Sequence, residues 1–147
     1  IVITGTEEER PIARLVTCHM REKATDLVGQ TDLGTAGMLL SQAALLVAND
    51  TGVSHLAAAL QVPSVIVCVG SDPLRWSPRD NRLHRVLVGP DTTVNEVMGA
   101  VHALERWVSR PSGNRGATPY DGHAVSEVSQ TLPPSTQYPP SEAFRRL

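Results

Sequence analysis

Short apolar segments rich in β-branched residues alternate with segments of helical character over the first 108 residues, and this alternation constrains the fold more than any other feature. The clearest apolar segment, residues 64–70, reads Ser-Val-Ile-Val-Cys-Val-Gly and has no polar face. A strand that is apolar on both faces is typical of a parallel sheet covered by helices on both sides. The sequence therefore predicts an α/β fold built on a Rossmann-like parallel sheet.

The individual elements can be placed from their residue patterns. Strands are predicted over residues 1–4, 26–29, 45–48, 64–70 and 85–88. Helices are predicted up to residue 20 from a cap at Thr6, and over residues 33–43, 53–60 and 93–108. The polar segment 71–83, which contains two prolines, is predicted to be a loop.

The chain changes character beyond residue 110. Six of its eleven prolines lie between residues 111 and 140, among serine, threonine, glycine and glutamine. Such a segment buries too little apolar area to offset the entropy lost on ordering. We therefore expect a folded domain over residues 1–110 and a disordered Pro/Ser-rich tail over residues 111–147. Because the first residue already stands in a predicted strand, we also expect a piece of a longer protein, truncated on the N-terminal side of this domain.

Composition excludes several classes of function. The net charge of −2 and the pI of about 6.2 do not indicate a nucleic-acid-binding surface. No apolar run approaches the roughly 18 residues that span a bilayer. Cys18 and Cys68 lack the spacing of a metal or redox site, so we expect two buried, reduced thiols of a cytosolic protein.

The most informative segment is Asn49-Asp50-Thr51-Gly52, followed by His55. It places an acid, a hydroxyl and a glycine where a parallel strand ends and a helix begins, the edge at which open α/β sheets bind ligands. The first turn of that helix offers backbone N–H groups and about half a positive charge, and Gly52 lets a phosphate approach closely. This pattern favours a diphosphate site, with His55 beside a phosphate or sugar hydroxyl. A helix cap with a packed imidazole explains the same residues without a ligand, so both interpretations stay open.

Two further turns are candidates for the same edge. Residues 5–9 read Gly-Thr-Glu-Glu-Glu, and one glutamate could bind ribose hydroxyls; the alternative is a solvated acidic turn that complements the helix dipole. Residues 70–78 could close over a ligand with Arg75 as a phosphate partner; the alternative is a surface loop anchored by Trp76. The other histidines have no partners at metal-ligand spacing, so no metal site is predicted.

These residues resemble glycosyltransferase family 9, the heptosyltransferases of lipopolysaccharide core synthesis and their relatives. The most specific part is the block Asp-Thr-Gly-x-x-His-Leu-x-Ala, which begins at Asp50, and the resemblance covers about residues 1–108. Weaker support comes from the glycine and glutamates of residues 5–9, Val28-Gly29, Val62-Pro63-x-Val65 and Gly70-x-Asp72-Pro73-x-Arg75-Trp76-x-Pro78.

The resemblance implies the C-terminal half of a GT-B glycosyltransferase, the half that binds the nucleotide-sugar donor. It implies inverting, metal-independent transfer of heptose or a similar sugar from a nucleoside diphosphate, ADP-heptose in the heptosyltransferases, to a cell-surface glycan such as lipopolysaccharide core. Asp50, Thr51, Gly52 and His55 would meet the diphosphate and the sugar. Glu8 would hold the ribose, and Thr31 and Leu33 would lie against the base.

The resemblance also implies what this chain lacks. The family's acceptor site and catalytic base belong to an N-terminal domain, and no residue here matches the base, so we expect no catalytic residue in this chain. A glycan or glycolipid acceptor would bind that missing domain, in a cytoplasmic enzyme peripheral to the inner membrane. The rival hypotheses are a non-catalytic module that binds a nucleotide or sugar phosphate, and a nucleotide-sugar epimerase with a similar donor crevice.

Overall fold

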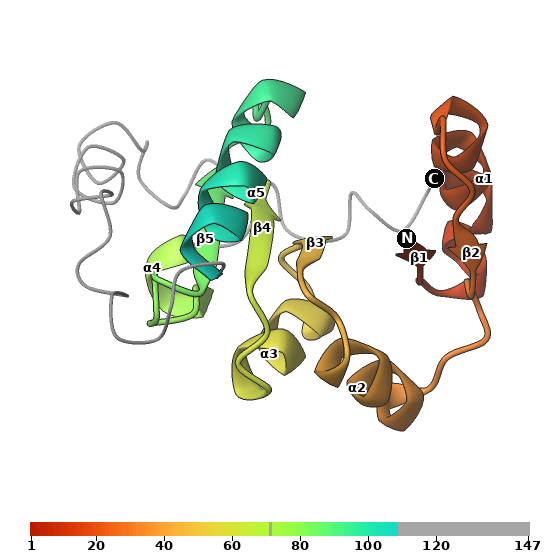
Figure 1. Ribbon diagram of the computed structural model, residues 1–147, viewed down its shortest axis with the longest axis horizontal. Coiled ribbons are helices and arrows are strands. Elements are labelled where there is room, and N and C mark those ends of the chain that lie inside the picture. The colour runs from red at the N-terminus through yellow and green to blue at the C-terminus, as the bar shows by residue number, and fades with distance from the viewer. Residues whose placement is uncertain (71, 109–147) are drawn as a thin grey trace.

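The computed structural model describes residues 1–70 and 72–108, in which helices and strands alternate as the sequence predicts (Figure 1). The strands are β1 (Val2–Ile3), β2 (Thr25–Asp26), β3 (Leu46–Asn49), β4 (Ser64–Cys68) and β5 (His84–Val88). The helices are η1 (Glu7–Glu9, a 3-10 turn), α1 (Arg10–His19), α2 (Leu33–Ser41), α3 (Gly52–Ala59), α4 (Pro73–Trp76) and α5 (Val94–Val108). The prediction of a disordered tail over residues 111–147 lies outside the described residues.

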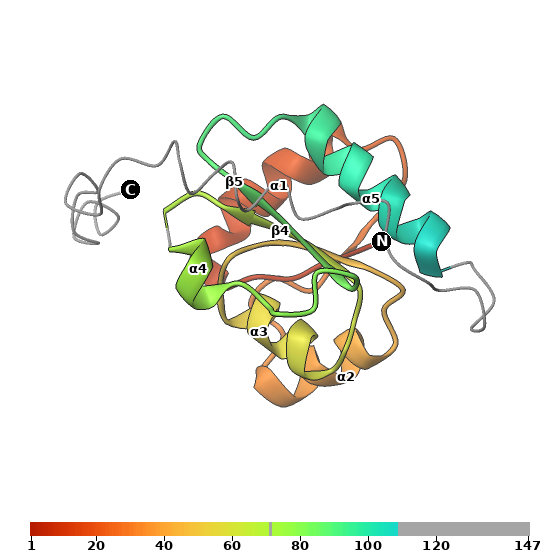
Figure 2. The ribbon, with the colours of Figure 1, turned by 90° about the vertical axis from the view of Figure 1, so that its left-hand side faces the viewer.

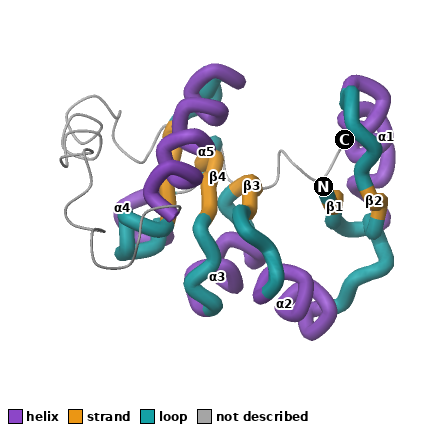
Figure 3. Tube along the Cα trace, viewed as in Figure 1, coloured by secondary structure: helices purple, strands orange, loops and turns teal. Residues whose placement is uncertain are grey.

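The strands are parallel throughout, and where the sequence predicted one sheet the described strands form two. β1 pairs with β2, and the larger sheet has the order β3-β4-β5. Within the described residues, β1 and β3 are each paired on one side only. Figure 3 shows β1, β2 and α1 at one end of the molecule and the larger sheet, with α5, away from them. The α/β class is confirmed, because parallel strands are connected through helices.

The core lies around the central strand of the larger sheet. Ser64, Val65, Ile66 and Cys68 of β4 are all buried. α5 covers one face with Leu104, and α2 and α3 cover the other, where Leu40 and Ala57 form a cluster with Val62 from the loop after α3 (Figure 2). This two-sided cover is why the segment 64–70 reads as apolar on both faces.

Two local expectations differ from the structure. The predicted loop 71–83 contains the short helix α4, which begins at Pro73, a residue whose fixed φ suits the first turn of a helix. Cys18 is exposed on α1, so the prediction of a buried thiol is wrong there, whereas Cys68 is buried in β4 as expected.

None of the helices in residues 1–70 and 72–108 combines the length and apolarity needed to cross a bilayer.

Candidate functional site

The junction between β3 and α3 is shaped by backbone hydrogen bonds on both sides of Thr51. The N–H of Asp50 donates to the carbonyl of Val67 at 3.1 Å, which extends the β3–β4 ladder one residue beyond the strand. Thr51 is extended (φ −142°, ψ −177°), and its carbonyl accepts the N–H of Ser54 at 3.0 Å, so the chain turns directly into α3. The Thr51 hydroxyl makes no capping hydrogen bond. The side chain of the N-cap residue, which in many helices accepts a hydrogen bond from the first turn, does not do so here.

The Asp50 carboxylate is half-buried beside the first turn of α3. The Ser54 hydroxyl lies 3.3 Å from its Oδ1 and 2.7 Å from the Thr51 carbonyl, and the Cys68 thiol lies 4.0 Å from its Oδ2. Ser54 is fully buried, and its single proton has the Thr51 carbonyl as the nearer acceptor. Neither neighbour of Asp50 was predicted from the sequence. The signals were the four-residue separation of Asp50 and Ser54 across the start of α3, and the parallel register that places Cys68 beside Asp50.

The start of α3 is open to solvent. Thr51, Gly52 and His55 are exposed, and a Cβ built on Gly52 would meet no atom within 4 Å. The helix thus presents the first turn of its backbone and the positive end of its dipole to an unobstructed surface. An anion at this position would find hydrogen-bond donors without displacing a side chain.

The loop after β4 reaches the same junction through α4. The rings of His55 and Trp76 meet edge to face, with centroids 6.1 Å apart and planes at 60°. The Arg75 guanidinium lies 4.9 Å from the centre of the Trp76 ring, within the range of a cation–π contact. Arg75 and Trp76 are both exposed, so the contacting side chains of His55, Trp76 and Arg75 lie at the surface beside the start of α3.

The predicted residue Glu8 lies on the turn after β1. Of the three glutamates there, Glu9 accepts the backbone N–H and hydroxyl of Thr6 in a capping box, and Glu7 pairs with Arg10. Glu8 is exposed and makes no hydrogen bond or ion pair with the described residues. Among the three, its carboxylate is the one not occupied by a local contact.

Thr31 and Leu33 flank the start of α2, on the loop after β2. Asp32 between them caps the helix, since its Oδ1 accepts the N–H of Thr35 at 2.7 Å, and this hydrogen bond lowers the pKa of Asp32. Thr31 is half-buried, whereas Leu33 is strongly exposed. A leucine side chain left in solvent beside a polar turn is available to pack against a flat apolar ligand group.

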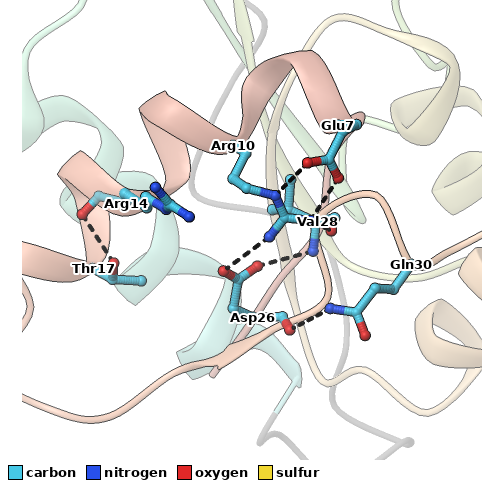
Figure 4. A network of polar contacts seen from close by, with 7 residues as sticks. All are labelled: Glu7, Arg10, Arg14, Thr17, Asp26, Val28 and Gln30. Carbon is cyan, nitrogen blue, oxygen red and sulfur yellow. Dashed lines mark hydrogen bonds and ion pairs between the residues drawn. The ribbon is translucent and has the colours of Figure 1, made fainter.

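The turn after β1 and the loop after β2 are joined by a network around Arg10 (Figure 4). Arg10 forms two hydrogen bonds with Glu7 and one with the carbonyl of Val28, each at 2.6 Å. The first of these contacts holds the pKa of Glu7 below its ordinary value, and Glu7 in turn raises the pKa of Arg10. The N–H of Gly29 donates to the carbonyl of Gly5 at 2.9 Å, which ties the same two segments through the backbone.

The structure thus arranges the predicted site residues in two groups. Asp50, Thr51, Gly52 and His55 meet at one junction, and Glu8, Thr31 and Leu33 lie on two adjoining segments. α2 connects the groups, because it begins at Leu33 and packs on α3 through the cluster around Leu40 and Ala57. No group of three or more metal-ligating side chains suited to an ion occurs in the part of the chain that the structure describes.

Comparisons with known proteins agree with one another. Residues 1–101 match the protein family described as glycosyltransferase family 9 (heptosyltransferase). Lipooligosaccharide heptosyltransferase 2 of Haemophilus ducreyi is 33% identical over 73 residues, which make up 47% of this chain and 21% of that protein.

Two solved structures share the fold. A glycosyl transferase of family 9 from Veillonella parvula superposes with a TM-score of 0.60 at 21% identity, over 71% of this chain and 35% of that one. The E. coli ADP-heptose lps heptosyltransferase II superposes with a TM-score of 0.65 at 24% identity, over 74% of this chain and 37% of that one. This chain therefore spans little more than a third of either solved relative.

Proposed function

Because the chain belongs to glycosyltransferase family 9, the heptosyltransferase family, we propose that residues 1–110 form the donor-binding part of an inverting glycosyltransferase. The whole enzyme moves heptose or a similar sugar from a nucleoside diphosphate to a cell-surface glycan such as lipopolysaccharide core. The relatives support this, since two of them are heptosyltransferases by name, one acting with ADP-heptose. The enzyme works on the cytoplasmic side of the inner membrane, with which it associates peripherally.

The observation that carries the donor role is the open start of α3. A diphosphate placed there accepts hydrogen bonds from the backbone of the first helical turn and lies at the positive end of the helix dipole. Gly52 leaves the approach free, because nothing lies within 4 Å of where a Cβ would stand. The Thr51 hydroxyl, which does not cap the helix, supplies one more donor.

His55 and Asp50 serve the sugar side of the diphosphate. His55 is exposed one turn into α3, where its ring contacts the ring of Trp76. In this proposal it donates a hydrogen bond to a phosphate oxygen or a sugar hydroxyl. The Asp50 carboxylate would repel a phosphate, and it accepts a hydroxyl of the sugar instead. Its position beside Ser54 and Cys68 keeps it at the end of β3 rather than over the helix axis.

The second group of residues receives the nucleoside. Glu8 accepts the two ribose hydroxyls, which a free carboxylate does in bidentate fashion. Thr31 and the exposed Leu33 contact the base. These contacts are separated from the diphosphate contacts by α2, which sets the spacing between the two halves of the donor.

Transfer itself requires chain beyond these residues. The acceptor and the base that deprotonates it come from the N-terminal domain of the whole enzyme, and no residue of this chain is assigned a catalytic role. Here the chain's own groups position the sugar donor and stabilise the charge that grows on the departing diphosphate. No metal takes part in this proposal.

Calorimetric titration of the 147-residue chain with ADP, GDP, UDP and inorganic pyrophosphate tests the donor role. We expect one nucleoside diphosphate to bind best, and binding to vanish in an Asp50→Ala, His55→Ala double variant. Gly52→Ala is the sharper variant, because its Cβ touches no protein atom but occupies the space a phosphate needs. We expect it to weaken binding by about tenfold or more without lowering the melting temperature, since alanine favours a helix more than glycine does.

Gly99→Ala in α5 is the matched control, since a Cβ there also meets nothing within 4 Å and lies outside the proposed site. Binding that survives both the double variant and Gly52→Ala would overturn the site. A folded wild-type chain that binds none of the four ligands would overturn the donor role. The rival hypothesis of a non-catalytic module is separated by assaying sugar transfer with the whole protein, which only an enzyme performs.

A further inference from the structure

Arg10 lies where the turn after β1 enters α1, and its guanidinium is shared between two segments far apart in the sequence (Figure 4). Its Nε and Nη2 donate to the two carboxylate oxygens of Glu7, and Nη2 also donates to the carbonyl of Val28, all at 2.6 Å. The Val28 side chain is buried, and Arg10 itself is only 27% exposed. This arrangement fixes Arg10 in one place, unlike a surface cation that moves among partners.

The Val28 end of the contact is itself held by Asp26. Asp26 at the end of β2 accepts the N–H of Val28 at 2.9 Å, and its other oxygen lies 3.8 Å from Nη1 of Arg10. Gly29 follows with φ of +70°, a conformation that favours glycine, and a Cβ there would collide with the Glu7 carboxylate. The Arg10–Glu7 pair therefore fills the space directly over the Gly29 turn.

The two segments joined in this way both carry proposed nucleoside contacts. Glu8 follows Glu7 directly, and Thr31 lies two residues after Gly29. The backbone pairing that starts with β1 and β2 ends at the hydrogen bond from the Gly29 N–H to the Gly5 carbonyl, before the chain reaches Glu8 on one segment and Thr31 on the other. The relative position of the ribose contact and the base contacts then depends on what ties the segments together.

We infer that Arg10 is a positioning residue for nucleotide recognition: it clamps the Glu8 turn against the Thr31 loop and so sets the nucleoside half of the donor site. The inference rests on the proposed function of donor binding and adds that the two halves of the donor site depend on different residues. The diphosphate half at α3 is built without Arg10, while the nucleoside half needs it. Only arginine fits this role, because a planar fork of donors is required to serve a carboxylate and a carbonyl at once.

Titration of Arg10→Ala tests whether Arg10 serves the nucleoside half of the site alone. The two ligands are inorganic pyrophosphate and whichever of ADP, GDP and UDP the wild-type chain binds best. We expect affinity for the nucleoside diphosphate to fall by about tenfold or more, as for the loss of a charged hydrogen-bonded contact, while affinity for pyrophosphate stays unchanged. Arg10→Lys keeps the charge but not the fork, and we expect it to lose most of the same affinity. Arg14→Ala is the matched control, since it removes an exposed arginine from the same helix with the same change in net charge.

Circular dichroism melts of each variant accompany the titrations. If Arg10→Ala melts early, Arg10→Lys at a temperature where it is folded gives the same comparison. Equal affinity of the folded Arg10 variants and the wild type for the nucleoside diphosphate would overturn the inference, and so would a parallel loss of pyrophosphate binding. A wild-type chain that binds neither probe would overturn the donor role itself, a result that is visible before any variant is measured.

Discussion

The buried histidine His84 makes the free energy of unfolding of this protein depend on pH. His84 at the start of β5 is 3% exposed, and its Nδ1 is hydrogen-bonded to the hydroxyl of buried Ser64 at 2.7 Å. Burial lowers the pKa of His84 below the ordinary 6.5, and the charge of nearby Asp80 opposes this shift only in part. The neutral ring is thus favoured in the folded protein.

The sign of the effect follows from this lowered pKa. Between the pKa of His84 in the folded chain and its ordinary value, the unfolded chain binds more protons, so the free energy of unfolding rises with pH. We expect it to be largest above about pH 6.5 and to fall as the pH drops below that value, until the lowered pKa is passed. Urea melts from about pH 8 down to about pH 5 measure this dependence.

His84→Gln supplies the control, because its amide is polar but does not titrate in this range. The variant should lose the component of the pH dependence between the two pKa values, whatever its stability at high pH. If the wild type and His84→Gln lose stability in parallel as the pH falls, the buried ring is not responsible.

At the scale of elements, α5 packs on the larger sheet with Leu104 as its buried side chain. Leu104 is fully buried against the face of the sheet that α2 and α3 do not cover. Leu104→Ala removes that contact and leaves a cavity, and we expect the free energy of unfolding to fall by about 2–5 kcal/mol. Denaturant unfolding followed by circular dichroism measures the difference.

Met98 on the same helix is the matched control, since its large apolar side chain is 44% exposed. Met98→Ala should change the free energy of unfolding by no more than about 0.5 kcal/mol, as for most surface substitutions. Similar losses in the two variants would mean that α5 does not dock through Leu104.

At the scale of the whole molecule, the division into two sheets leaves backbone and apolar groups exposed. β1 and β3 are each paired on one side only within the described residues, and Val2 and Val47 on them are half exposed. Ile12, Leu15 and Val16 of α1 add an exposed apolar face to the same end of the molecule as β1. Unpaired edges and apolar patches of this kind promote association between chains.

We therefore expect the 147-residue chain to be marginally stable and to self-associate. Sedimentation velocity over a hundredfold range of concentration should show a rising mean mass, and Leu15→Glu should reduce it. Arg14→Gln, next to it but on an already polar position, makes the same change in net charge as Leu15→Glu and controls for it. A sharp, monomeric melt that does not change with concentration would contradict this expectation.

The order and kind of the elements were predictable because they depend on local patterns. The run of apolar residues in 64–70 became the buried centre β4, and the capping and acidic signals at Thr6 became η1 and α1. The junction of Asp50 to His55 was also predictable, because a strand end followed at once by a helix start needs no distant contact. Boundaries were less well placed, as for β2, which lies at Thr25–Asp26 rather than over residues 26–29.

The amino-acid sequence by itself determined that this chain is a parallel α/β protein of glycosyltransferase family 9, in which a helix starts directly after the turn at residues 50–52. The tertiary structure decided which strands pair, that Ser54 and Cys68 flank Asp50, that Trp76 meets His55, and that Arg10 joins Glu7 to Val28. The physical reason is the range of the interactions. Strand and helix signals come from neighbours within a few residues, whereas pairing, ring contacts and a shared guanidinium depend on segments that meet only when the chain has folded.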